Sequence, residues 1–149
     1  MIRLYQPQDL DALMALWLAT TIEAHPFIEP SYWLESEPLV RNVYIPDATT
    51  WVYSHNEKIS GFISVMEQQF IGALFVDSAQ QGQGIGKALI EQVKDVYPKL
   101  LLEVYQENTS ALQFYLTMGF QVVSEQPHPE TGQITLIMQW VADLSALLD

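Results

Sequence analysis

Residues 74 to 89 read Leu-Phe-Val-Asp-Ser-Ala-Gln-Gln-Gly-Gln-Gly-Ile-Gly-Lys-Ala-Leu, and this stretch decides the fold. An apolar run ending at Val76 predicts a strand, the alternating glycines predict a turn, and the apolar spacing from Lys87 predicts a helix. Glycine has no Cβ, so the turn can adopt conformations and close approaches that other residues obstruct. The first N–H groups of a helix are unpaired and carry partial positive charge. The stretch therefore predicts an anion-binding turn suited to a phosphate.

Two well-known phosphate-binding patterns do not fit this turn. The spacing of Gly82, Gly84 and Gly86 is Gly-x-Gly-x-Gly, whereas the dinucleotide-binding pattern is G-x-G-x-x-G. A Walker A loop needs glycine where Gln81 stands and Ser or Thr where Ala88 stands, which disfavours a nucleotide-binding regulator. A tight turn without a ligand is the structural alternative.

Two motifs together resemble one family. Gln81-x-x-Gly84-x-Gly86 resembles the Q/R-x-x-G-x-G/A signature of the GNAT superfamily, the GCN5-related N-acetyltransferases. Asn108-x-x-Ala111-x-x-Phe114-Tyr115-x-x-x-Gly119-Phe120 is similar to the second hallmark of that family. The motifs stand in the expected order with an apolar run between them, and the resemblance extends over residues 2–140.

Length and composition predict a single globular domain over residues 1–149, with 49% apolar residues. The chain has 18 acidic residues against six Lys and Arg, for a net charge of −12. This charge disfavours nucleic acid and favours cationic partners such as amines or lysine-rich segments, although acidity can also serve solubility alone. The absence of cysteine excludes disulfides, thiolate metal sites and a cysteine nucleophile.

Other features set expectations for location and partners. No apolar run is long enough for a membrane span, and the N-terminus lacks a signal-peptide pattern, so we expect a cytoplasmic protein without a membrane partner. His25, His55 and His128 are scattered over loops, so no metal site is expected. We expect a monomer or a weak homodimer.

The order of elements predicts a mixed α/β fold. We expect strands at 2–5, 50–54, 58–66, 70–76, 100–106, 121–126 and 133–140. Helices are expected at 7–20, 87–97 and 108–118, with another that Ser31 could cap and Pro38 would kink or split. This is the order of the GNAT fold: a central mixed, mostly antiparallel sheet of about seven strands with a V-shaped splay, and about four helices.

The resemblance implies acetyl-CoA as cosubstrate. In GNAT proteins the strand before the glycine turn parts from the next strand and leaves a cleft for it. The backbone of Leu74, Phe75 and Val76 would then bind the pantetheine arm, and Asn108 and Tyr115 would complete the cofactor site. The pyrophosphate would be held by backbone N–H groups of Gln81, Gly82, Gln83, Gly84, Ile85, Gly86 and Lys87. Gln83 departs from a position that is frequently basic in the family.

Acetyl transfer to an amine needs a general base and a general acid, because the amine must be neutral and the leaving thiolate must be stabilised. Tyr115 falls at the family's general-acid position, although a packed core tyrosine is the alternative. Glu103 interrupts an apolar strand, where a carboxylate is costly unless paired, hydrated or used. It resembles the glutamate that serves as general base in relatives that acetylate protein amines. The resemblance implies that this base acts through a water molecule while the amine attacks the thioester directly. A water chain without Glu103 is the alternative.

The acceptor is expected to be a primary amine. The acidic chain and the aromatic residues Phe27, Trp33 and Phe70 would suit an aliphatic amine with a positive head, with His25 close by. A small core beneath a loop is the structural alternative for these aromatics. The stretches 25–28, 39–41 and 102–106 are similar to small bacterial GNAT proteins of the YiaC type, which implies a protein lysine. A small amine, such as a polyamine or amino acid, and a non-catalytic acyl-CoA-binding module remain alternatives.

Overall fold

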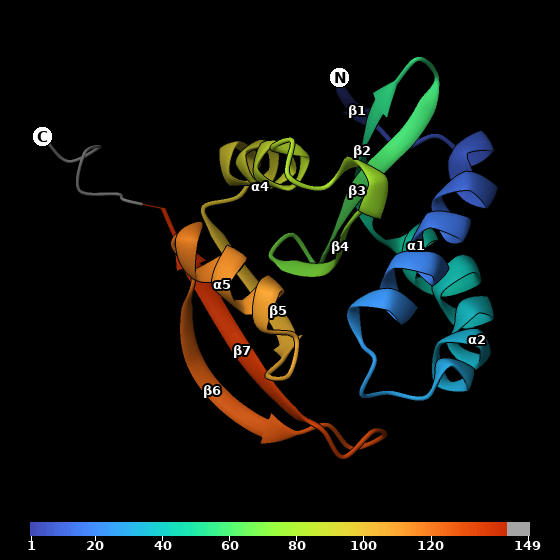
Figure 1. The fold of residues 1–149 in the computed structure, drawn as a ribbon. Coiled ribbons are helices and arrows are strands. Elements are labelled where there is room, and N and C mark those ends of the chain that lie inside the picture. The colour runs from blue at the N-terminus through green and yellow to red at the C-terminus, as the bar shows by residue number, and fades with distance from the viewer. Residues whose placement is uncertain (143–149) are drawn as a thin grey trace, which may run out of the picture.

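The computed structural model describes residues 1–142 and contains one seven-stranded sheet with helices on both faces (Figure 1). The strand order is β1-β2-β3-β4-β5-β7-β6, and every neighbouring pair is antiparallel except β4 and β5. The strands are β1 (Ile2–Leu4), β2 (Thr49–His55), β3 (Lys58–Met66), β4 (Phe70–Val76), β5 (Lys99–Tyr105), β6 (Gln121–Pro127) and β7 (Ile134–Val141). The α-helices are α1 (Leu10–Ala24), α2 (Pro30–Leu39), α3 (Ile45–Asp47), α4 (Ile85–Val96) and α5 (Thr109–Thr117). The predicted mixed, mostly antiparallel sheet is confirmed.

The parallel pair β4 and β5 separates soon after it forms. Its pairing register covers Phe70 with Leu101 and Ile71 with Leu102, and stops there. From Gly72 to Val76, β4 keeps its partner β3 on one side and has no strand partner on the other within the described chain. The two strands diverge from this point, as Figure 1 shows, so the predicted splay is confirmed.

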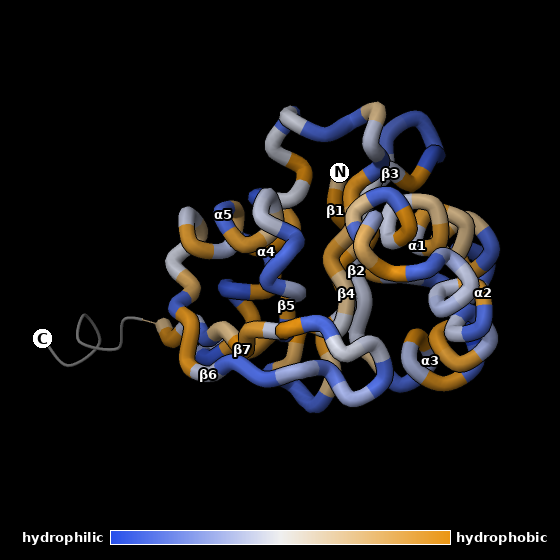
Figure 2. The backbone as a smooth tube through the Cα atoms, turned by 60° about the horizontal axis from the view of Figure 1, so that its bottom comes forward, coloured by the Kyte–Doolittle hydropathy of each residue, from blue (hydrophilic) through white to orange (hydrophobic). Residues whose placement is uncertain are grey.

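The apolar residues form one cluster on each face of the sheet. On one face, α1 packs Leu13, Met14 and Trp17 against Val52 and Phe62 of the sheet. On the other face, α4 and α5 pack against β3, β5 and β7 around a larger set: Ile63, Ile85, Leu89, Ile90, Val93, Leu100, Leu102, Tyr115, Phe120 and Met138. Figure 2 shows hydrophobic residues along α1 and around α3. Met14 and Trp17 of α1 therefore belong to the core.

The first helix differs from its predicted bounds. A 3₁₀ turn precedes α1, and α1 continues to Ala24 rather than ending at Thr20. It ends there because Pro26 disfavours the helical conformation in the residue before it, and His25 accordingly has φ −127° and ψ 63°.

The segment after α1 is split, as predicted. Its helix begins at Pro30 rather than after Ser31, because the fixed φ of proline suits the first helical position. Pro38 lies inside α2, and a π-helix over Val40–Tyr44 joins it to α3.

Strand β6 lies at one edge of the sheet and is exposed throughout, with a bulge between Val122 and Ser124. The hairpin of β6 and β7 confirms the last two predicted strands. Residues 1–142 contain no helix with the length and hydropathy needed to cross a membrane.

An ion pair joins β1 to the start of α1. The guanidinium of Arg3 donates to both carboxylate oxygens of Asp9, at 2.8 and 2.9 Å, and the Gln6 N–H donates to Asp9 at 2.8 Å. Asp9 is only 8% exposed. The hydrogen bond from Arg3 is the main cause that lowers the pKa of Asp9 below its usual 3.8, against the opposing effect of burial.

We expect Asp9→Asn to lower the free energy of unfolding at pH 7 by roughly 1–3 kcal/mol, because it removes a charged acceptor from three donors. A carboxyl whose pKa is lower in the folded state stabilises the fold above its unfolded pKa, and this stabilisation is lost as pH falls through the folded pKa. Urea unfolding should therefore show a gap between wild type and variant that closes below pH 3.8.

Asp11→Asn is the matched control. Asp11 also pairs with an arginine, Arg41, at 2.6 Å, but its side chain is 92% exposed, so little change is expected. Equal losses in the two variants would contradict a special role for Asp9.

Candidate active site

The glycine turn has the backbone conformation that its sequence predicts. Gly82 and Gly84 have φ of +83° and +82°, a region that L-residues rarely adopt, and Gly84 is the N-cap of α4. A Cβ on either residue would meet no atom within 4 Å. These two glycines are therefore required by the backbone conformation and not by crowding.

Gly86 serves a different purpose. It lies in the first turn of α4 with no positive φ, and a Cβ on it would stand 3.4 Å from the ring of Phe114 on α5. Gly86 therefore faces the helix that carries the second sequence motif, and a Cβ here would be in van der Waals contact with that helix.

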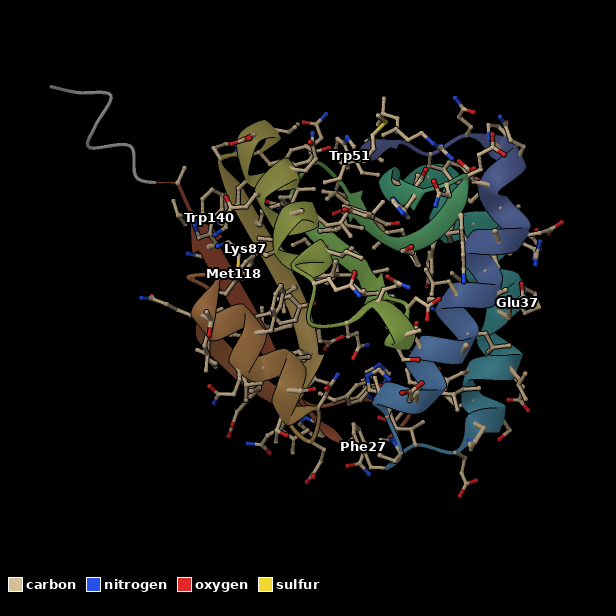
Figure 3. The ribbon with its side chains drawn as sticks, turned by 45° about the horizontal axis from the view of Figure 1, so that its top comes forward. Phe27, Glu37, Trp51, Lys87, Met118 and Trp140 are labelled. Atoms are coloured by element: carbon tan, nitrogen blue, oxygen red, sulfur yellow. The ribbon has the colours of Figure 1, made fainter. Side chains whose placement is uncertain are left out.

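A cavity of about 310 Å³ lies beside this turn. It is bounded by the end of β4, the turn and the start of α5, and most of the predicted cofactor residues line it: Leu74, Phe75, Val76, Gln81, Gly82, Ile85, Gly86, Asn108 and Tyr115. The other three, Gln83, Gly84 and Lys87, are exposed on the same turn and helix start, and Figure 3 shows Lys87 on α4. We call this space the turn cavity.

Two side chains fix the rims of the turn cavity. The Gln81 side-chain amide donates to the Val76 carbonyl at 3.2 Å, which ties the turn to the end of β4. The Asn108 side chain accepts from the Ala111 N–H at 3.4 Å and caps α5.

A second cavity, of about 390 Å³, shares a wall with the turn cavity. The shared residues are Leu74, Phe75, Asn108, Ala111 and Tyr115. The remaining wall comes from α1, α2, the π-helix, β5 and the turn between β6 and β7, and includes aromatic residues and two glutamates: Trp17, His25, Tyr32, Trp33, Tyr44, Glu103, Tyr105, His128 and Glu130. We call this space the acidic cavity.

Tyr115 stands between the two cavities. It is 9% exposed, and burial raises the pKa of its phenol. The phenol is therefore protonated at neutral pH and can donate a proton at the boundary of both spaces.

The sequence predicts that Glu103 interrupts a buried strand, whereas in the structure its side chain is exposed. Buried Leu102 and Val104 flank it on β5, and strand alternation turns Glu103 to the other side, where it lines the acidic cavity. The hydroxyl of Thr135 on β7 donates to its Oε2 at 2.8 Å, and Thr135 is fully buried. Sequence reasoning missed Thr135, because only the register of β5 on β7 brings it near.

His25 is buried in an aromatic cluster at the end of α1. Its Nδ1 lies 2.6 Å from the Thr21 carbonyl, which can only accept, so Nδ1 carries the proton. Burial lowers the pKa of His25. Its ring centre lies 5.0 Å from that of Trp33, 5.3 Å from that of Tyr105 and 5.7 Å from that of Phe27. His25 is therefore an uncharged part of the wall at neutral pH.

The four predicted substrate residues are not all brought together. His25 and Trp33 line the acidic cavity. Phe27, in the loop after α1 (Figure 3), packs against His25 and Tyr105 without lining it. Phe70 does not line it either, because it pairs with Leu101 at the closed end of the splay. Of the four residues, the structure therefore brings His25 and Trp33 to the cavity and leaves Phe27 and Phe70 outside its wall.

Comparisons with known proteins agree with this geometry. Residues 23–142 match the family model described as an acetyltransferase (GNAT) domain. The chain is 44% identical over 140 residues to the peptidyl-lysine N-acetyltransferase YiaC of Escherichia coli (strain K12), covering 94% of this chain and 96% of that protein.

Solved structures share the fold. The apo form of YjaB from Escherichia coli, solved in solution, has a TM-score of 0.82 and 28% identity, covering 96% of this chain and 98% of that one. An aminoglycoside 6'-N-acetyltransferase crystallised with coenzyme A has a TM-score of 0.69 and 16% identity, covering 95% and 96%. With both motifs meeting at one cleft and the family model matching most of the chain, this protein belongs to the GNAT family and is an acetyltransferase.

Proposed function

We propose that this enzyme transfers the acetyl group of acetyl-CoA to the side-chain amine of a lysine in a protein. The observation that carries the proposal is the position of Tyr115, which borders both the turn cavity and the acidic cavity. The similarity to a peptidyl-lysine N-acetyltransferase supports lysine as the acceptor. We further propose that the enzyme works in the cytoplasm as a monomer or weak homodimer.

The residues around the turn cavity fit coenzyme A. The unpaired edge of β4 offers backbone groups to an amide-bearing arm, and the left-handed glycines present the start of α4 to a diphosphate. In a chain with a net charge of −12, Lys87 in the first turn of α4 adds a local positive charge. Leu74, Phe75, Val76, Gln81, Asn108 and the turn 82–87 would hold the molecule.

Bound acetyl-CoA would supply a thioester whose carbonyl carbon a neutral amine can attack. The acceptor arrives as an ammonium ion, because the ordinary pKa of a lysine is about 10.4. Glu103, with one oxygen held by Thr135, takes the first proton from the nitrogen through a water molecule. Glu103 can serve as this base because it lines the acidic cavity, in which the acceptor amine is proposed to bind.

Tyr115 completes the proton transfers. Its phenol gives a proton to the sulfur as the carbon–sulfur bond breaks, and it regains one from the nitrogen that has formed the amide. Glu103 releases its proton to solvent. The products are an N-acetylated lysine and free coenzyme A, and one proton leaves overall.

The proposal is tested by supplying purified protein and acetyl-CoA with a panel of lysine peptides and small amines. We expect acetylation of lysine peptides, and a Tyr115→Phe variant that loses on the order of 10²-fold in kcat while its KM for acetyl-CoA changes little. Transfer to small amines only would reject the protein-lysine acceptor. An unchanged kcat in the variant would remove Tyr115 from the acid role.

A second test addresses the glycine turn. We expect Gly84→Glu to abolish acetyl-CoA binding in calorimetry, because it strains a left-handed position and adds negative charge where the diphosphate would lie. Gly132→Glu is the matched control: Gly132 has φ +73°, has equally open space around it, and lies in the distant turn between β6 and β7. Full affinity in Gly84→Glu would contradict the proposed binding mode.

A third test asks whether Thr135 positions Glu103 for catalysis or only stabilises the fold. We expect Thr135→Val to lower kcat/KM for a lysine peptide by about 10-fold, the scale of one hydrogen bond to a charged group. As in Glu103→Gln, the loss should be largest at low pH, where the neutral amine is scarce. Thr135→Ser, which keeps the hydroxyl, should recover most of the activity. A loss of the same size at every pH would indicate a structural role for this pair.

A further inference from the structure

A second carboxylate, that of Glu130, lines the acidic cavity together with Glu103 and comes from the turn between β6 and β7. We propose that Glu130 binds the ammonium group of the acceptor lysine, which leaves Glu103 free to take its proton. This inference rests on the proposed function and assigns the recognition of the acceptor's charge to one residue.

The turn that carries Glu130 is held by its own hydrogen bonds. The N–H of His128 donates to the Gln133 carbonyl and that of Gly132 to the His128 carbonyl, both at 2.8 Å. The Nδ1 atom of the His128 ring accepts from the N–H of Glu130 at 3.1 Å and from that of Thr131 at 3.4 Å. The backbone of Glu130 is therefore fixed within the turn, although its side chain is exposed.

Aromatic contacts fix this turn against the acidic cavity. The His128 ring centre lies 5.7 Å from that of Tyr105 on β5 and 6.4 Å from that of Tyr32 on α2, and all three side chains line the cavity. The turn thus bridges the two sides of the cavity mouth, one formed by β5 and the other by α2.

The charge of Glu130 acts inside the cavity. Burial is the main cause that raises the pKa of Tyr32 to about 12, and the nearby Tyr105 and the carboxylate of Glu130 contribute to the same rise. Burial also raises the pKa of Tyr105, against a hydrogen bond with Thr131 and with added effects of Glu103 and Glu130. Both phenols are therefore neutral at pH 7, so they add no charge to the cavity and do not neutralise the two carboxylates.

No lysine or arginine lines the acidic cavity in the described chain. Arg41, which belongs to the neighbouring π-helix, is held by Glu37 at 2.7 Å and by Asp11 at 2.6 Å. Two carboxylates that share a recess without a basic partner favour a cationic ligand. An aliphatic cation fits best, because the rings of Tyr32, Trp33 and Tyr105 can pack on methylene groups and attract the charge.

A lysine side chain has both the aliphatic stem and the charge. Two carboxylates also solve a conflict, since a single carboxylate that binds an ammonium ion tightly also stabilises its protonated form. In the proposed arrangement Glu130 attracts and orients the ammonium, and Glu103 accepts one proton from it.

Steady-state kinetics with a peptide that the wild type acetylates provide the first test. We expect Glu130→Gln to raise the KM for the peptide by about 10-fold or more, with kcat within a few-fold of wild type and an unchanged KM for acetyl-CoA. Added salt should weaken peptide binding in the wild type and have a smaller effect in the variant. Glu130→Asp should recover part of the affinity.

Glu125→Gln is the matched control. Glu125 is exposed on the same hairpin and does not line the acidic cavity. Its substitution by glutamine changes the net charge of the protein by the same amount. Equal effects in the two variants would overturn the proposal, since they would reflect the overall charge of the protein. A parallel rise in the KM for acetyl-CoA and fall in Tm for Glu130→Gln would overturn it as well, since the turn would then be structural.

A binding experiment separates this inference from the proposed function. Calorimetric titration of Nα-acetyl-lysine methylamide into the protein saturated with coenzyme A needs no turnover. Binding to the wild type that weakens in Glu130→Gln supports the role of Glu130 even if no peptide is acetylated, a result that would count against the proposed function alone. No binding to the wild type, or equal binding to both, would overturn the role of Glu130.

Discussion

The early end of the hydrogen-bond ladder between β4 and β5 is the constraint on which the site depends. Two residue pairs hold the strands together at one end, and beyond them β4 has no strand partner on this side among residues 1–142. Unpaired backbone groups near a protein core are costly unless something bonds to them. The parting of the strands thus creates both the space for a substrate and the backbone groups that would bind one.

The same parting separates the chemistry into two halves. The glycine turn and the positive end of α4 lie on one side, and a recess lined by carboxylates and aromatic rings lies on the other. In the proposed function, an anionic coenzyme and a cationic amine would thereby bind in different cavities of a strongly acidic protein. Tyr115 belongs to the wall between them, where its phenol is kept protonated by burial.

Local sequence patterns predicted the residues around the turn cavity well and those around the acidic cavity poorly. The strand and the glycine turn follow from local residue patterns, and Asn108 and Tyr115 are located by the resemblance of their motif to that of the GNAT family. The acidic cavity is assembled from α1, α2, β5 and the β6–β7 turn. Thr135 and Glu130 come into position only through strand register and the fold of a distant hairpin, and Phe70 lies at the closed end of the splay because register overrides residue type.

The contact between Gly86 and the ring of Phe114 has a consequence for how this protein can change over evolutionary time. It makes the packing of α4 on α5 depend on a position without a side chain, and Tyr115 is the next residue along α5. A Cβ at position 86 would already touch that ring at van der Waals distance, so a side chain larger than alanine would extend further into the space between the two helices. Such a change at position 86 would need a smaller residue in place of Phe114, next to the tyrosine proposed as the proton donor.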